Sequence, residues 1–201
     1  MRHALSFPAL ALATTLVGCG SPETVVTLTV NGTPVQGQVV VVLPYDRDSI
    51  LAALAAQAPT PQPDPAPLVA LLDSLRQAYA AMAKAPPGDP RARKALEARR
   101  AQLEPRVEVL RTAQHAWRDA AYQAYDSVTY SFTRLLARDP FTDTTESGGA
   151  VTVRLPKNGR WWVTVRAWDA ADPYSEWYWN LPLEGDSVHL TTANAQHRPR
   201  I

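Results

Sequence analysis

The side chains that most readily carry out covalent or metal chemistry in this chain belong to one cysteine and four histidines. Zinc sites and nucleophilic active sites need such residues at fixed spacings, and the sequence contains no H-E-x-x-H, C-x-x-C or G-x-S-x-G pattern and no phosphate-binding loop. His115, His189 and His197 are isolated from one another. The sequence therefore predicts no catalytic residues, no metal and no cofactor, and it argues against an enzyme. What remains is Cys19, a single thiol that can be modified but cannot form a disulfide within the chain.

The position of Cys19 gives this thiol a specific context. A basic start, Met1-Arg2-His3, precedes a mostly apolar stretch over 4–16, which is shorter than the ~20 residues of a membrane-spanning helix. This combination is typical of a secretory signal peptide, and the alternative is an uncleaved N-terminal anchor with a chance cysteine.

The residues Leu16-Val17-Gly18-Cys19 resemble the lipobox of bacterial lipoproteins. The resemblance implies that residues 1–18 are removed as a signal peptide, that the Cys19 thiol carries diacylglycerol, and that 19–23 form a short tether at the membrane. Two or more acyl chains anchor a protein stably. In Gram-negative bacteria a residue other than Asp after the cysteine, here Gly20, implies the outer membrane. The expected location is therefore the bacterial cell envelope, at the periplasmic face of the outer membrane.

Removal of residues 1–18 leaves a body with balanced charge. That segment contains one arginine and no acid, so the 20 basic residues of the chain fall to 19, against 19 acidic ones. Domains that bind nucleic acid are usually basic, and this balance gives no support for a nucleic-acid partner.

Strand-like sequence occurs in two separate blocks, 24–47 and 148–193. In the first block apolar residues alternate, Asn31-Gly32 predicts a turn, and an apolar run follows over 39–43, so we expect a hairpin. In the second block alternation returns in several short runs. Together the blocks supply about six strands, which predicts a small antiparallel β-sandwich, and we expect 194–201 to form a polar tail.

The segment 48–138 separates the two blocks and is rich in Ala, Leu, Arg, Glu and Gln, which favour helices. In its second half apolar residues recur every seven positions, which is typical of a packing seam between helices: Leu96, Leu103, Leu110, Trp117 and Ala124. Pro105 should bend or break the helix that carries this seam. The sequence thus predicts an α+β fold, a sandwich interrupted by an inserted α-helical hairpin or small bundle.

The stretch 149–167, GAVTVRLPKNGRWWVTVRA, resembles the carboxypeptidase regulatory-like and the related transthyretin-like or immunoglobulin-like sandwiches of bacterial surface lipoproteins. In those domains a strand ends in a Leu-Pro turn with a glycine, and the next strand alternates aromatic and aliphatic residues. A segment similar to the one that opens these domains occurs at Val35-Gln36-Gly37-Gln38-Val39. They are accessory or binding modules, so the resemblance implies a non-catalytic role. The helical segment departs from their pattern.

Aromatic residues gather in the second strand block, where five of the six tryptophans fall between Trp161 and Trp179. Strand alternation places three of them in the core, Trp161, Trp177 and Trp179, and directs Trp162, Trp168 and Tyr178 to the opposite face. That face is either packed under the helices or exposed as a platform for sugar rings, peptides or an apolar patch of a partner.

These observations support three hypotheses of function. The first is a membrane-anchored, non-catalytic structural or protein-interaction module, whose helical insertion over 48–138 docks on another envelope protein. The second is a glycan- or peptidoglycan-binding module, which takes a polysaccharide partner on the face of Trp162, Trp168 and Tyr178. The third is a periplasmic adaptor-like protein, because such adaptors also place a helical hairpin between strands, although prolines interrupt the first helical arm here.

Overall fold

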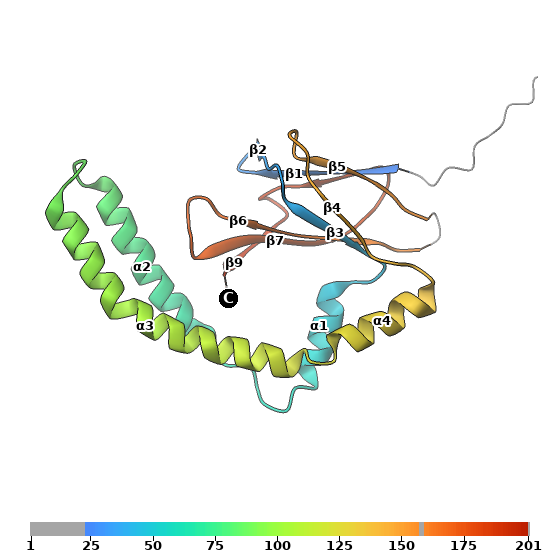
Figure 1. Ribbon diagram of the computed structural model, residues 1–201, viewed down its shortest axis with the longest axis horizontal. Helices are drawn as coiled ribbons and strands as arrows, with labels where there is room; N and C mark the ends of the chain where they lie inside the picture. Colours follow the sequence, from blue (N-terminus) through green and yellow to red (C-terminus); the bar gives the residue numbers. More distant parts are fainter. Residues whose placement is uncertain (1–22, 157–158, 201) are drawn as a thin grey trace, which may run out of the picture.

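The computed structural model describes residues 23–156 and 159–200, which form an α+β fold (Figure 1). The predicted signal peptide, 1–18, and the predicted lipidation site, Cys19, lie outside the described residues. Within the described part of the chain, no helix is both long enough and apolar enough to span a bilayer.

Nine strands form two sheets in this part of the chain. The smaller sheet contains β1 (Glu23–Val30), β2 (Thr33–Pro34), β5 (Ala150–Arg154) and β8 (Ser187–Leu190). The larger sheet has the order β4-β3-β6-β7-β9 and contains β3 (Val39–Leu43), β4 (Phe141–Thr144), β6 (Trp162–Trp168), β7 (Ser175–Pro182) and β9 (Gln196–Pro199). Neighbouring strands are antiparallel, except that β8 runs parallel to β1.

The hydrophobic core lies between the two sheets and follows from the alternation along the strands. Val163 and Val165 of β6 are almost fully buried, Trp161 precedes them on the same face, and Trp179 of the neighbouring β7 is 1% exposed. They pack in one cluster with residues of the smaller sheet, such as Val26. Burial of each large aliphatic side chain contributes roughly 1.5–3 kcal/mol, so this cluster holds the sandwich together. The predicted core positions of Trp161 and Trp179 are confirmed, whereas Trp177 is only partly buried against the same cluster.

The predicted hairpin between the first two strand runs is wrong. Asn31 and Gly32 do form a tight turn, with positive φ at both residues, but this turn pairs β1 with the two-residue β2. β2 ends at Pro34, which has no N–H to extend the ladder. The chain then crosses to the larger sheet, where β3 pairs with β4 and β6.

Two further strands were not expected from the sequence. β4 lies before the second strand block, and β9 lies within 194–201, the segment that the sequence predicts to be a polar tail. Both are edge strands of the larger sheet. Polar residues suit an edge strand, and they also remove the apolar alternation by which a strand is recognised.

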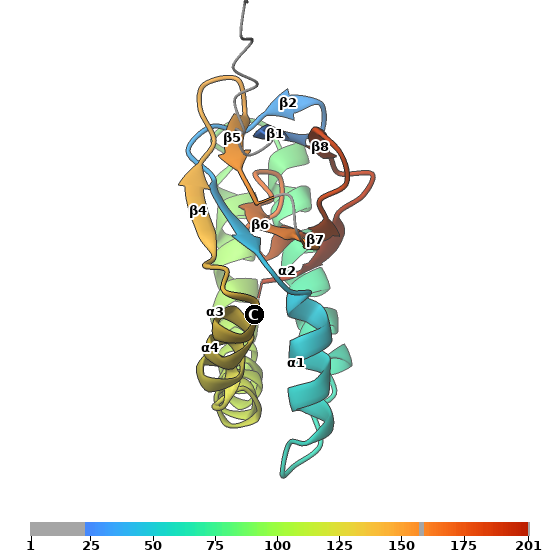
Figure 2. The same ribbon diagram turned by 90° about the vertical axis from the view of Figure 1, so that its right-hand side faces the viewer.

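Four helices connect β3 to β4 in the chain: α1 (Arg47–Ala56), α2 (Ala66–Lys84), α3 (Pro90–Ala121) and α4 (Tyr125–Leu136). Figures 1 and 2 show α1 and α4 on the side of the larger sheet, and Figure 1 shows that α3 forms a long arch. The side chains of Asp46 and Asp89 cap the first turns of α1 and α3, because each accepts a hydrogen bond from a backbone N–H two residues later. α2 and the facing part of α3 form a two-helix arm with a buried seam: Leu68, Leu72, Leu75, Leu103 and Val107.

Pro105 does not break α3, contrary to the expectation from the sequence. The helix is continuous from Pro90 to Ala121 and curves as a whole (Figure 1). Leu103 and Val107, on either side of the proline, are buried against α2. A proline has no N–H to donate the backbone hydrogen bond of a helix, but packing on that face keeps the helix continuous at Pro105. The interruption falls instead between α3 and α4, at 122–124.

Candidate functional site

The three aromatic residues predicted to form a face do share one side of β6 and β7, but they differ in exposure. Trp168 is 69% exposed, Trp162 is half-buried, and Tyr178 is 1% exposed. Arg198 lies over the Tyr178 ring, with its guanidinium carbon 3.7 Å from the ring centroid. Of the two alternatives for this face, packing under the helices describes Tyr178, because basic side chains and a helix cover its ring, whereas Trp168 is exposed.

The start of α1 is fastened to this outer face of the sheet. The hydroxyl of Tyr178 donates to Asp48 and accepts from Arg47, and Asn180 donates to the capping carboxylate of Asp46 over 2.6 Å. Burial and the Asp48 hydrogen bond raise the pKa of Tyr178 to about 12, so its hydroxyl stays protonated and remains a donor. Burial alone would raise the pKa of Asp46, but hydrogen bonds from Ser49, Asn180 and the backbone lower it below its usual value.

A second set of hydrogen bonds joins α2 to the loop between β6 and β7 and to the start of β7. Arg76 of α2 donates from Nε to Asp172 and from Nη2 to Ser175 Oγ over 2.6 Å. Beside them the rings of Tyr79 and Tyr174 are 6.1 Å apart. The helical layer is thus attached to the sheet near both ends of the arch, at α1 and at α2.

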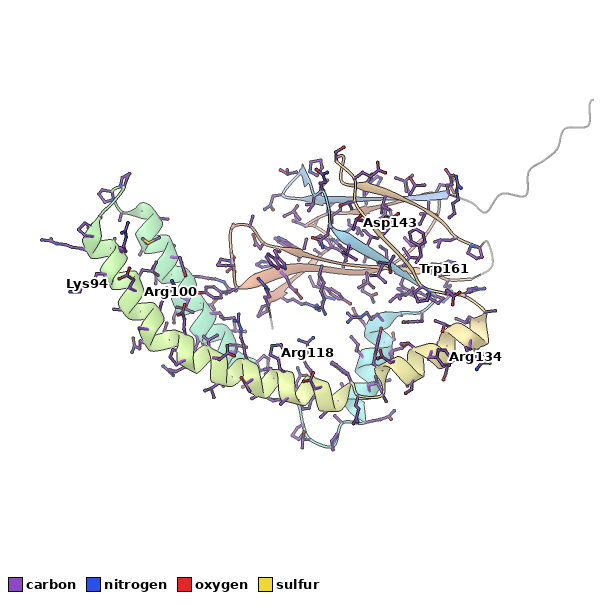
Figure 3. All side chains as sticks on the ribbon, in the orientation of Figure 1. Lys94, Arg100, Arg118, Arg134, Asp143 and Trp161 are labelled. Atoms are coloured by element: carbon purple, nitrogen blue, oxygen red, sulfur yellow. The ribbon has the colours of Figure 1, made fainter. Side chains whose placement is uncertain are left out.

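Between these two attachments lie two adjoining cavities, which we call the arginine chamber. The first has a volume of about 230 Å³ and lies between α1, α3 and the sheet, and the second has about 530 Å³ and lies toward Trp168. Arg166 and Glu176 line both. Six arginines line the chamber: Arg47, Arg111, Arg118, Arg166, Arg198 and Arg200. Figure 3 places Arg118 on the side of α3 that faces the sheet.

A different surface occurs on the two-helix arm. An apolar groove of about 660 Å³, which we call the arm groove, is lined by Pro67, Ala70, Leu71, Pro105, Arg106, Val109 and Leu110. Val109, which lines this groove, is 69% exposed. Arg106 is the charged member of the groove lining.

The sequence predicted the helical segment that forms the arm but not the arginine chamber. Its arginines come from α1, α3, β6, β9 and the residue after β9, and they have no common spacing in the chain. The pairing of β6, β7 and β9 brings Arg166 and Arg198 together, and α1 and α3 bring further arginines to this face of the sheet. Among the described residues, no group of three or more His, Cys, Asp or Glu side chains is arranged to hold a metal ion.

Comparison with known proteins gives no relative for this chain. No protein-family model matches it, and no curated protein and no solved structure matches it either.

Proposed function

We propose that this protein is a lipid-anchored, non-catalytic protein of the bacterial cell envelope, which docks on another envelope protein through the arm groove. The anchor is diacylglycerol on Cys19 at the periplasmic face of the outer membrane, and the sandwich is a module of the carboxypeptidase regulatory-like or immunoglobulin-like kind. The observation that carries the docking proposal is the apolar arm groove with its exposed Val109.

The arrangement of the arm supports a docking role. In Figure 1 the described chain begins at one end of the sandwich, whereas the arm projects beyond the other end. An anchor at the beginning of β1 therefore lies at the end of the sandwich away from the arm, whose groove is near the start of α2. This separation leaves the arm groove accessible to a partner while the sandwich stays near the membrane.

Charge on the arm indicates the chemistry of the partner. From Pro90 to Arg106, α3 carries six basic residues and two glutamates, an excess of four positive charges. A groove between two helices is a usual receptor for the apolar face of a third helix. The partner segment that fits is an amphipathic helix with acidic residues beside its apolar face, because complementary charges guide association and fix orientation.

The anchoring proposal is tested by the mass of the protein purified from the envelope. We expect a chain that begins at Cys19 and carries the mass of diacylglycerol, and we expect the Cys19→Ala variant to retain residues 1–18 without lipid. A mature chain with an unmodified thiol would show that the lipobox resemblance is misleading.

The docking proposal is tested by co-isolation of the acylated full chain from envelopes in mild detergent. We expect Val109→Asp to lose a protein that co-isolates with the parent, because an aspartate in an apolar contact leaves a buried charge. The matched control is Leu135→Asp on α4, which makes the same change at an 82% exposed position outside the arm groove. Equal co-isolation by parent and Val109→Asp, or equal loss in both variants, contradicts the proposal.

A further inference from the structure

The arginine chamber has a strong imbalance of charge. Six arginines line its two cavities, and Glu176 is the only acidic residue among the described residues that line them. The lining therefore carries an excess of five positive charges. Glu176 is 7% exposed and forms an ion pair with Arg198 over 2.8 Å, so the one carboxylate is already engaged.

Arg166 occupies the centre of this imbalance, since it lines both cavities. Burial lowers the pKa of its guanidinium, Glu176 opposes this shift, and the nearby guanidinium groups of Arg47, Arg198 and Arg118 add to it. Arg166 forms no ion pair with a carboxylate of the described residues. Like charges held close together without sufficient counter-charge destabilise a fold, and such arrangements are characteristic of sites that bind the opposite charge.

Two further observations point to a ligand in the chamber. The Nε atom of Arg111 is buried and has no hydrogen-bond partner among the described residues, although an unsatisfied buried donor is costly. In addition, the chamber holds two of its guanidinium groups against aromatic rings: Arg198 over Tyr178, and Arg200 over Trp168 at 4.0 Å. Stacking fixes the plane of a guanidinium and leaves its N–H groups in that plane for bidentate binding to an anion.

We propose that the arginine chamber binds a sugar-sized ligand that carries at least two anionic groups, carboxylate or phosphate. Its two cavities, of about 230 and 530 Å³, suit a small molecule, since ligand pockets typically span roughly 300–1,000 Å³. Arg166, between the cavities, contacts both parts of the ligand. The exposed indole of Trp168, at the edge of the larger cavity, contacts the ring of the ligand beside Arg200. This inference does not depend on the docking function of the arm.

The test is isothermal titration calorimetry of the acylated full chain in detergent, at low and at physiological salt. The probes are inorganic pyrophosphate, trigalacturonate and the neutral sugar maltotriose. We expect binding of pyrophosphate, trigalacturonate or both, and none of maltotriose. Binding of pyrophosphate alone identifies a phosphate ligand, and binding of trigalacturonate alone identifies a carboxylate ligand. If neither anion binds, or if maltotriose binds equally well, the proposal is wrong.

Two variants distinguish binding in the arginine chamber from attraction of the anion by the general surface charge. Arg166→Gln should weaken binding about tenfold or more, because it removes charge-assisted hydrogen bonds at the centre of the site. Arg91→Gln, which makes the same change on an exposed residue of α3 outside the chamber, should change binding less than about twofold. Arg118→Gln provides a second chamber variant if the first does not fold. Equal weakening by Arg91→Gln and the chamber variants would show that only surface charge is responsible.

The melting temperature of the ligand-free protein distinguishes a ligand-binding role of Arg166 from a structural one. Because Arg166 is repelled by its neighbours, we expect Arg166→Gln to have an unchanged or higher melting temperature without ligand, and a smaller rise in melting temperature with the anionic probe. A markedly lower melting temperature in the free variant would contradict the assignment of a ligand site and make Arg166 a structural residue.

Discussion

The attachment of the arm to the sandwich rests on Arg76, and its removal should loosen the helical layer. The Arg76→Met variant keeps the aliphatic stem of the side chain but removes the donors to Asp172 and Ser175. Asp172 is only 13% exposed, so its carboxylate keeps little access to water when the guanidinium is lost. Hydrogen bonds to charged groups contribute ~1.5–3 kcal/mol each, and Asp172 retains its bond from the Tyr174 N–H.

We therefore expect Arg76→Met to lower the free energy of unfolding by about 2 kcal/mol. For a protein of this size the loss corresponds to about 4–8 °C in melting temperature. The assay is thermal unfolding by circular dichroism, together with hydrogen exchange of the α2 amides, which should accelerate more than those of β6. The control is Arg154→Met, which breaks an ion pair with Glu23 whose side chains are 75% and 53% exposed, and which should cost less than about 1 kcal/mol.

The pH dependence of the same variant provides a second readout. Burial raises the pKa of Asp172, but hydrogen bonds from Ser175, from the Tyr174 N–H and from Arg76 lower it below its usual value. A carboxylate with a depressed pKa stabilises the fold above its unfolded-state pKa, and this stabilisation is lost as the pH falls through its folded-state pKa. On acidification below about pH 5, the parent should lose more stability than Arg76→Met. Equal melting temperatures at pH 7, or parallel pH profiles, would refute the role assigned to Arg76.

Three further substitutions test other parts of the fold by urea denaturation. Ala137→Gly should stabilise the protein by about 0.5–1 kcal/mol, because Ala137 has φ 49° at the end of α4; Ala85→Gly, at φ −75°, should give no such gain, and a gain there instead would contradict the argument. Tyr178→Phe should cost about 1–2 kcal/mol, because Asp48 loses its donor, and a neutral result would show that the contact with α1 contributes little. Trp168→Ala should change stability by less than about 1 kcal/mol, since the ring is exposed, and a larger loss would mean that Trp168 is a packing residue.

Patterns that depend on neighbouring residues could be predicted from the sequence. The alternation around Val163 follows directly from the geometry of a strand, and the seven-residue spacing of Leu96 and Leu103 follows from that of a helix; these side chains are buried as expected. The predicted seam does not extend to Ala124, which lies beyond the end of α3 and is exposed. Pro105 shows the limit of this reasoning, because packing against α2 outweighs its local preference to interrupt a helix.

Features that depend on how distant segments meet could not be predicted. The sequences of β1 and β3 are typical of strands, but nothing in them indicates that the two strands belong to different sheets. The face of Trp162, Trp168 and Tyr178 was predicted from alternation, yet the burial of Tyr178 comes from Arg198 and from α1. The arginine chamber likewise depends on long-range arrangement, because it forms where α1 and α3 meet the paired strands β6, β7 and β9.

The measurement that tests the docking claim most directly is site-specific photocrosslinking in intact envelopes. A photoreactive amino acid at position 109 should form an adduct with a protein segment that contains acidic residues beside an apolar face, and Arg106→Glu should reduce its yield. The same amino acid at position 135, outside the arm groove, should not form this adduct. Absence of an adduct from position 109, or the same adduct from both positions, would contradict the proposal that the arm groove is the docking surface.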